Sequence, residues 1–271
     1  MTIAVFGAAG QLGHALERVA RERCVDIAPF DHAGADITDR DAVREAVRAS
    51  GARLIINAAA YTAVDRAESE PDRAFAINRD GVRNLASLGL PLIHVSTDYV
   101  FDGTKKGAYV ESDPVAPLGV YGRSKLEGER AAANALIVRT SWVYGREGVN
   151  FVKTMLRLGR ERDVLRVVND QRGCPTFADD LADGLLTMAQ KYRPGLYHLA
   201  GSGTATWYDF AREIFGADTR PRVEPITTAE YPTPARRPAN SALDGTLARI
   251  DFGVELPDWK DGLKRMLESL Q

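Results

Sequence analysis

Short apolar runs alternate with longer amphipathic stretches over the first two-thirds of the chain. This alternation is typical of a parallel sheet whose faces are covered by helices. It predicts an α/β fold with a doubly wound, Rossmann-type parallel sheet. Strands are expected at residues 2–6, 24–31, 53–60, 90–98, 135–142, 164–170 and 195–201.

The amphipathic stretches between these runs predict the covering helices. Asp39 can cap a helix that ends at Ser50, and the apolar residues of that helix are spaced as one inward face. Right-handed crossovers place the carboxyl ends of all strands along one edge, where open α/β sheets bind ligands. The helices are expected at residues 11–23, 40–50, 74–88, 151–161, 179–191 and 258–270, with one more beginning near residue 120.

The alternation loosens beyond Tyr144, and the last part of the chain is rich in proline. Loop-rich segments after a sheet of this kind usually build a lobe over the strand ends. The predicted division is a dinucleotide-binding domain at 1–145, to which 162–195 returns, and a smaller substrate lobe formed by 146–161 and 196–271.

Composition narrows the classes of partner. The 271 residues carry a net charge of −2, with 45% hydrophobic and 27% charged positions, which gives no reason to expect nucleic acid or a membrane surface. No apolar stretch is long enough to cross a bilayer, and the N-terminus does not resemble a signal peptide. Two cysteines, Cys24 and Cys174, form no zinc-ligand pattern. We expect a cytoplasmic protein without a metal site.

The segment GAAGQLG lies between the first strand and the first helix. Gly7 permits a tight turn, Gly10 lets the backbone approach a pyrophosphate, and Gly13 lets helix and strand pack closely. The amides of Gln11, Leu12 and Gly13 would point at phosphate. A purely structural glycine turn is the alternative, but the flanking strand and helix favour dinucleotide binding.

Further cofactor contacts are expected at the ends of strands two and three. Asp31 lies 18 residues after Gly13, where a carboxylate can hydrogen-bond ribose hydroxyls and repel a 2′-phosphate. Asp36 and Ile37 could border the adenine, although a lone aspartate is usually just solvated. The small side chains of NAAAY would let ribose and nicotinamide approach the backbone, at Ala58, Ala59, Ala60 and Tyr61.

The segment VYGRSKLEGE places Tyr121 and Lys125 one helical turn apart on one face. In isolation this pair fits a solvated helix surface, and Lys125 also stands four residues before Glu129. Thr97, however, belongs to the segment STD, which ends strand four on the ligand edge of the sheet. A hydroxyl residue there, followed by Tyr-x-x-x-Lys behind an N-terminal glycine loop, resembles the active site of short-chain dehydrogenases/reductases.

Ketone reduction needs these residue types. A free tyrosine, with a pKa of about 10, holds its proton too tightly for an ideal acid near neutrality. A nearby ammonium should lower that pKa. Thr97 can hydrogen-bond the carbonyl oxygen, and the resemblance implies that Lys125 also reaches the cofactor ribose.

A narrower resemblance covers essentially the whole chain. The segments FGAAGQLG, NAAAYTAVDRAESEP, STDYVFDG, VYGRSKLEGE, RTSWVYG, VVNDQRGCPT and YPTPARRPANSAL occur in this order. Together they resemble the dTDP-4-dehydrorhamnose reductase family. The resemblance implies reduction by NADPH, with NADH also accepted, of the C4 ketone of dTDP-6-deoxy-L-lyxo-4-hexulose. It assigns Tyr121, Lys125 and Thr97 to catalysis, and Thr97, Asp98 and Trp142 to the sugar nucleotide.

Other positions qualify this resemblance. Some members carry a glutamate used in a magnesium-bridged dimer where this chain has Ala15, so a monomer and a homodimer both stay open. Trp142 could cover an apolar sugar face or belong to a core. Arg236, Arg237 and Asn240 fit a diphosphate or a solvated surface equally well.

Two other readings remain. One is a different sugar-nucleotide reductase, epimerase or dehydratase; dehydratases usually place an acidic pair after the threonine, whereas here Tyr99 follows Asp98. The other is a non-catalytic regulatory subunit, resembling that of methionine adenosyltransferase. Such a subunit would bind a cofactor or partner without turnover.

Overall fold

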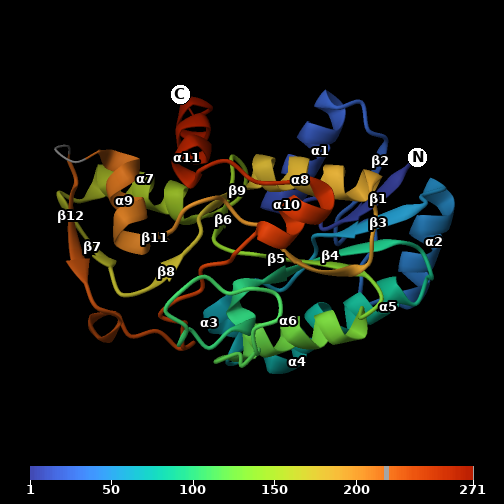
Figure 1. Cartoon of the computed structure of the whole chain (residues 1–271), viewed down its shortest axis with the longest axis horizontal. Coiled ribbons are helices and arrows are strands. Elements are labelled where there is room, and N and C mark those ends of the chain that lie inside the picture. Colours follow the sequence, from blue (N-terminus) through green and yellow to red (C-terminus); the bar gives the residue numbers. More distant parts are fainter. Residues whose placement is uncertain (217–219, 271) are drawn as a thin grey trace.

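A six-stranded parallel sheet forms the centre of the molecule, as the apolar runs predicted. The structure is a computed structural model and describes residues 1–216 and 220–270. Across the sheet the order is β10, β5, β4, β3, β1 and β2 (Figure 1). These strands cover Gly195–His198, Leu136–Thr140, Leu92–Thr97, Leu54–Asn57, Ile3–Phe6 and Ile27–Phe30. After β1 the chain adds β2 on one side, whereas β3 and the strands after it lie on the other side of β1. This change in the order of strands opens a crevice at the carboxyl ends of β1 and β3.

Helices cover both faces of the sheet (Figure 1). On one face, α1 (Gln11–Glu22) packs against α8 (Ala178–Gln190). The other face carries α2 (Arg40–Ser50), α5 (Val82–Ala86) and α6 (Val120–Ala131). The carboxylate of Asp39 accepts hydrogen bonds from the first amides of α2, which confirms its predicted capping role.

The helix predicted at 74–88 is interrupted. It begins as α4 (Pro71–Phe75), widens into a π-helical segment at Ala76–Gly81 and ends as α5. The widened turn carries Asn78, whose buried side chain hydrogen-bonds both backbone groups of Tyr61 and the hydroxyl of Ser124. A π-helical turn inside a helix is often found at a functional site, and this one lies directly beneath α6.

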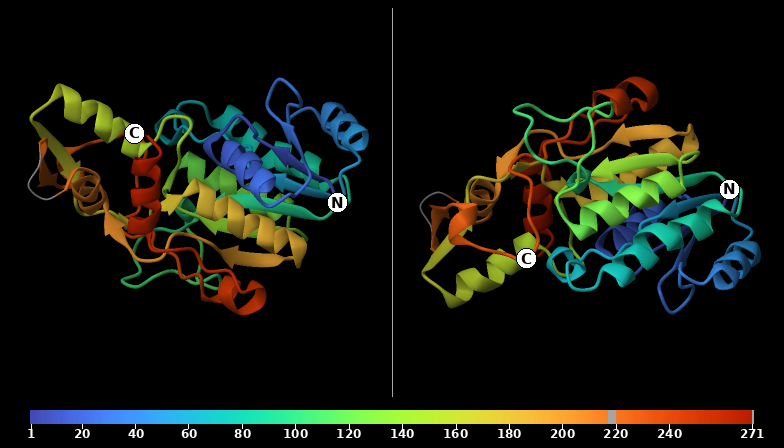
Figure 2. Two further views of the ribbon diagram at one scale, coloured as in Figure 1. Left: turned by 90° about the horizontal axis from the view of Figure 1, so that it is seen from above. Right: turned by 90° about the horizontal axis from the view of Figure 1, so that it is seen from below.

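A smaller lobe lies beside the sheet rather than over one of its faces (Figure 2). Its core joins α7 and α9 to the C-terminal helix α11 and to the short pair β6 and β9. Two other short strands, β8 and β11, pair antiparallel. The bounds of these elements are Phe151–Glu161 for α7, Trp207–Phe215 for α9, Trp259–Glu268 for α11, Val143–Tyr144 for β6, Thr176–Phe177 for β9, Arg172–Gly173 for β8 and Ala205–Thr206 for β11.

The arrangement of the lobe differs from the predicted division in two places. Strand β7 (Val164–Val168), expected to return to the large sheet, pairs with β12 (Arg222–Ile226) in the lobe. Strand β10, three of whose residues were assigned to the lobe, instead forms the edge of the large sheet, with α10 (Thr246–Phe252) packed on it. Pairing between distant strands decides both cases, and a local apolar pattern does not specify the partner. Residues 217–219 and 271 of the predicted lobe lie outside the described residues.

Strand β5 ends at Thr140, two residues earlier than expected. Trp142 adopts a left-handed backbone conformation with φ of 48°, which a strand does not allow. In the described part of the chain, no helix combines the length and the apolar character needed to span a membrane.

Candidate functional site

A cleft of about 690 Å³ runs along the carboxyl ends of the strands. Loops and helices that follow β1, β2, β3, β4 and β5 line it. It therefore lies at the edge where the strand order predicted a ligand. The predicted cofactor residues that line it are Gly7, Gly10, Gln11, Leu12, Asp31, Asp36, Ile37, Ala58, Ala59, Ala60, Tyr121 and Lys125.

The glycine loop is shaped so that a backbone, not a side chain, faces the cleft. Gly7 has φ of +85°, and a Cβ there would come within 2.5 Å of the Ala59 amide nitrogen. A Cβ on Gly13 would overlap the carbonyl oxygen of Gly7 and come within 2.5 Å of Ala8. No larger residue fits either position without moving the loop. This is the cradle that a dinucleotide pyrophosphate at the start of α1 requires.

Two predicted cofactor residues do not line the cleft. Gly13 lies beneath the loop, where it lets α1 approach the strand end. Tyr61 is buried in a small apolar cluster and its hydroxyl donates to the carboxylate of Glu70. The Tyr61 side chain therefore lies outside the cleft in which the cofactor is predicted, against an apolar cluster and a carboxylate partner from the following helices.

Asp31, His32 and Asp36 line the part of the cleft where the adenosine is predicted. The Asp31 carboxylate accepts a hydrogen bond from the Gly34 amide (2.7 Å). His32 lies 3.5 Å from the Asp36 carboxylate. Two carboxylates here suit ribose hydroxyls better than a 2′-phosphate.

We expect Asp31→Ala to weaken NADH binding by about tenfold and NADPH binding by less. Loss of a hydrogen bond to a charged group costs about 1.5 kcal/mol, and the bond to the 2′-hydroxyl is available only in NADH. Titration of the cofactor fluorescence measures both dissociation constants. Asp41→Ala, an exposed acid on α2 outside the cleft, is the matched control. Equal weakening of both cofactors by Asp31→Ala would contradict the ribose assignment.

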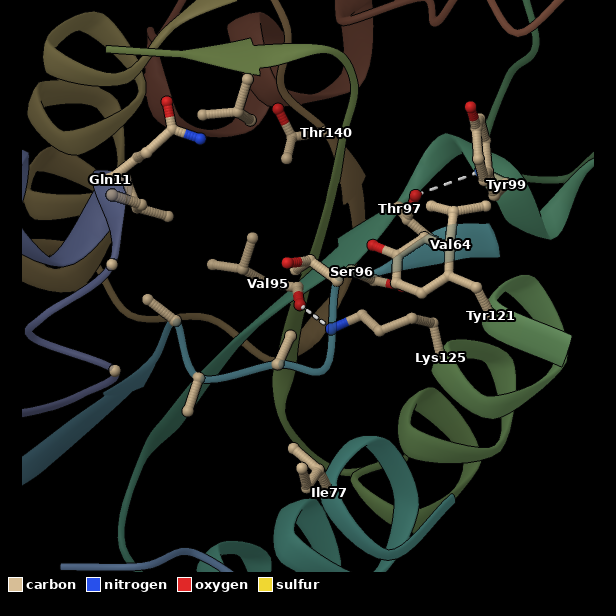
Figure 3. Close-up of a pocket in the computed structure, with 18 of the residues that line it drawn as sticks. Gln11, Val64, Ile77, Val95, Ser96, Thr97, Tyr99, Tyr121, Lys125 and Thr140 are labelled. Carbon is tan, nitrogen blue, oxygen red and sulfur yellow. Dashed lines mark hydrogen bonds between the residues drawn. The ribbon is translucent and has the colours of Figure 1, made fainter. Parts of the chain in front are cut away.

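The three predicted catalytic side chains converge on the end of β4 (Figure 3). Thr97 is the last residue of β4, and Tyr121 and Lys125 project from the first two turns of α6. Lys125 is only 2% exposed, and its Nζ donates to the carbonyl oxygen of Val95 (2.6 Å). The ring of Tyr121 meets the ring of Tyr99 edge-on at 5.7 Å. Lys125 is therefore buried and Tyr121 partly buried in the cleft wall, and the pair does not belong to a solvated helix face.

Burial governs the protonation of this pair. It raises the pKa of Tyr121 to about 12, against the opposing effect of a hydrogen bond with Thr97. Desolvation therefore outweighs the expected lowering of the phenol pKa by Lys125, whose ammonium donates to Val95. Burial also lowers the pKa of Lys125 to about 8, while the charge of Glu129 opposes this change. Near neutral pH, Tyr121 holds its proton and Lys125 is charged.

Asp98 lines the cleft directly after Thr97. Its Oδ1 accepts a hydrogen bond from the Thr97 hydroxyl (3.1 Å), and burial raises its pKa to about 7. Near neutral pH this carboxyl group can therefore either accept or donate a hydrogen bond toward a ligand hydroxyl.

Trp142 lines the cleft, but its ring does not offer an open face to a sugar. It stacks on Trp207 with 3.5 Å between ring centroids and 3° between planes. A Cβ on Gly173 would come within 2.6 Å of the indole Nε1 and closer still to Cε2, so the backbone there also lies against the ring. Trp207 therefore covers one face of the Trp142 ring, and contact of this ring with a sugar stays a prediction.

Several cleft residues were not predicted. Thr140 is the last residue of β5 and Ser141 follows it, and their position at a strand end is a signal that could have identified them. Trp207 comes from α9 in the lobe, and no local pattern connects it to the sheet. The remaining unpredicted lining residues are Ala9, His32, Ala35, Thr62, Val64, Arg73, Ile77, Val95, Ser96, Tyr99 and Val143.

Two of the polar residues Arg236, Arg237 and Asn240 have structural partners. Arg237 forms an ion pair with Asp65 of α3 (Val64–Ala67) at 2.8 Å. The Asn240 amide donates to the carbonyl oxygens of Lys105 and Gly107. Arg236 lines a small pocket beside Tyr99 and Tyr121. Arg237 and Asn240 therefore hold the C-terminal segment against the large domain.

Ala15, which stands where some related chains carry a glutamate, is fully buried in α1. It packs in the core between the sheet and α8. This position therefore presents no ligand to a metal ion.

Comparisons with known proteins agree with this geometry. The family model described as the RmlD substrate binding domain matches residues 1–271. The dTDP-4-dehydrorhamnose reductase of Sinorhizobium fredii (strain NBRC 101917 / NGR234) is 47% identical, over 100% of this chain and 98% of the relative. That of Escherichia coli (strain K12) is 44% identical over the same shares.

A solved structure also matches the fold of this chain. The dTDP-4-dehydrorhamnose reductase from Bacillus anthracis str. Ames, in complex with NADP, superposes with a TM-score of 0.94. It is 39% identical and the match covers 99% of both chains. The chain described here therefore belongs to the dTDP-4-dehydrorhamnose reductase family.

Proposed function

We propose that this chain reduces the C4 ketone of dTDP-6-deoxy-L-lyxo-4-hexulose to dTDP-L-rhamnose with NADPH, and that it also accepts NADH. The convergence of Thr97, Tyr121 and Lys125 beside the glycine loop carries the proposal. Full-length similarity to reductases of this name, one of them solved with NADP, supports the choice of substrate and cofactor.

Tyr121, Thr97 and Lys125 each have a separate role in the reduction. The bound nicotinamide supplies a hydride to the C4 carbon, and the oxygen at C4 then needs a proton. Tyr121 holds that proton near neutral pH and gives it to the oxygen. Thr97, at the strand end beside it, would turn its hydroxyl from Asp98 to the same oxygen and so donate a hydrogen bond that stabilises charge there. The charged Lys125 stabilises the phenolate that remains.

We assign substrate contacts to Thr97, Asp98 and Trp142. Asp98 lies next to Thr97 in the cleft, where it can hydrogen-bond a sugar hydroxyl. Trp142, held against Trp207, would contact the sugar through the part of the ring that lines the cleft. We assign the remaining cleft residues near the glycine loop to the cofactor.

The direct test combines the purified chain, the dTDP-4-keto sugar and either NADPH or NADH. Loss of nicotinamide absorbance should accompany formation of dTDP-L-rhamnose, identified by mass and by NMR. No turnover with either cofactor would exclude the reductase. Cofactor binding without turnover would instead favour a regulatory subunit. Conversion of the sugar without net cofactor oxidation would favour an epimerase or dehydratase.

We expect reductive turnover to fall as the pH rises through about 8. The pKa of Lys125 is lowered to about 8 by burial, so the stabilising ammonium is present below this pH and is lost above it. Tyr121, with a pKa of about 12, keeps its proton over the same range. A pH profile of kcat/KM measures the effect. Lys125→Arg is the control, because arginine stays charged and its residual activity should lack this decline. A decline in Lys125→Arg like that of the parent would assign it to another group.

We further propose that the protein acts in the cytoplasm on this small-molecule substrate, as a monomer or homodimer. The two free cysteines, Cys24 and Cys174, fit a reducing compartment.

A further inference from the structure

A buried ion pair lies directly behind the catalytic lysine. Glu129 on α6 and Arg139 on β5 are 5% and 3% exposed. The guanidinium binds the carboxylate through two hydrogen bonds, from Nε at 2.9 Å and from Nη2 at 2.7 Å. The hydroxyl of Ser96 on β4 donates to the same carboxylate at 2.5 Å. Glu129 stands four residues after Lys125, a spacing common on solvated helix surfaces, but the structure pairs it with Arg139 and buries it.

These contacts fasten the catalytic helix to two strand ends. Ser96 and Arg139 are register partners on β4 and β5. Ser96 stands between Val95, whose carbonyl oxygen binds Lys125, and the catalytic Thr97. Glu129 stands one helical turn after Lys125 on α6. One carboxylate therefore links the helix that carries Tyr121 and Lys125 to the strand that carries Thr97.

The charge of Glu129 also acts on Lys125. A buried ammonium is disfavoured, and a nearby carboxylate is the kind of group that restores its charge. Glu129 opposes the effect of burial on Lys125. The other groups near Lys125 do not supply a negative charge. Tyr121 keeps its proton, the buried His94 of β4 has its pKa lowered well below its usual value, and Asn78 beneath α6 is uncharged. Asp98, directly after β4, acts on the Tyr121 side of the pair.

We propose that Glu129 is a positioning residue for the reduction: its buried carboxylate keeps the Lys125 ammonium charged and holds α6 at the ends of β4 and β5. Burying an ion pair for stability alone gains little, since desolvation offsets the attraction. Keeping Lys125 charged would explain why this ion pair is buried beside the catalytic helix α6. The consequence for turnover rests on the proposed reductase function, whereas the effect on the charge of Lys125 does not.

The test is an NMR titration of the lysine ε-methylene groups in Glu129→Gln. The Lys125 signal is assigned by its absence in Lys125→Arg. Glu129→Gln keeps the shape and loses the charge, so the titration midpoint of Lys125 should fall by about 1 pH unit. Glu129→Asp keeps the charge and should stay close to the parent midpoint. In the reductase assay, the alkaline decline of kcat/KM should move to lower pH together with the NMR midpoint.

Asp179→Asn is the matched control. It removes the carboxylate of a different ion pair, Arg18–Asp179, which is partly buried and lies outside the cleft. The Lys125 midpoint should not move in that variant. Should Glu129→Gln fail to fold, the double variant Glu129→Gln, Arg139→Gln leaves no unpaired buried charge. It should still show a downward shift, smaller than that of Glu129→Gln because the repulsion by Arg139 is also removed.

An unchanged Lys125 midpoint in the folded Glu129→Gln or double variant would overturn the proposal, whatever the loss of stability. Absence of turnover in the parent protein would reject the reductase function alone. The NMR result would still decide whether Glu129 controls the charge of Lys125.

Discussion

Tyr121→Phe is expected to lower kcat for ketone reduction by about 10²–10⁴, the contribution usual for a positioned general acid. Only the hydroxyl is removed, and the ring still packs edge-on against Tyr99. The fold and the cofactor cradle at Gly7 and Gly13 should therefore be unaffected. Steady-state kinetics and cofactor titration together measure the effect: a large fall in kcat with a nearly unchanged dissociation constant for NADPH.

Tyr197→Phe provides the matched control. Its hydroxyl also makes a side-chain hydrogen bond, to Asp251, but at the outer edge strand β10. Its kcat should equal that of the parent protein. Near-normal turnover in Tyr121→Phe would remove this residue from the role of proton donor and direct attention to Asp98 or Thr97.

The second large effect is expected from Gly13→Ala. The added methyl group would overlap the carbonyl oxygen of Gly7 and crowd Ala8. Because the clashing atoms belong to the backbone, the loop must shift. Its amides would then no longer point at the pyrophosphate. We expect the affinity for NADPH and NADH to fall by at least about 100-fold, equal to about 2.7 kcal/mol. Isothermal titration calorimetry measures this loss.

Gly107→Ala is the corresponding control. A Cβ at Gly107 meets nothing within 4 Å, so the same substitution should leave cofactor affinity unchanged. Circular dichroism separates a local change from unfolding. Parent-like affinity in a folded Gly13→Ala protein would mean that the loop does not bind the pyrophosphate.

The predictable part of the fold was the part encoded locally. The buried strand Ile3–Phe6 is uniformly apolar, and Leu54–Asn57 is apolar up to its last residue. Asp39 caps α2 by accepting from amides two and three residues later in the chain. The π-helical segment at Ala76–Gly81 was not predictable in this way. It accompanies contacts of Asn78 with residues 17 and 46 positions away. Likewise, β7 pairs with β12 because of how the lobe packs, which its own sequence does not indicate.

The candidate site follows the same rule. Thr97, Tyr121 and Lys125 could be found because strand ends and helical spacing place them on one edge. Their protonation states could not be predicted from the sequence, because the desolvation of Tyr121 depends on all the residues packed around it. Trp207 was missed because only the packing of α9 brings it to Trp142.

The packing of α1 against α8 has a consequence for synthesis on the ribosome. Arg18 of α1 binds Asp179 of α8, a residue 161 positions later. The apolar residues of α1, among them Leu16 and Val19, belong to the same core as Leu181 and Leu185. While the nascent chain lacks α8, that face of α1 has no cover, and uncovered apolar surface promotes aggregation. Fragments that end before residue 178 should therefore depend on chaperones, although they already contain the glycine loop and the Tyr121–Lys125 pair.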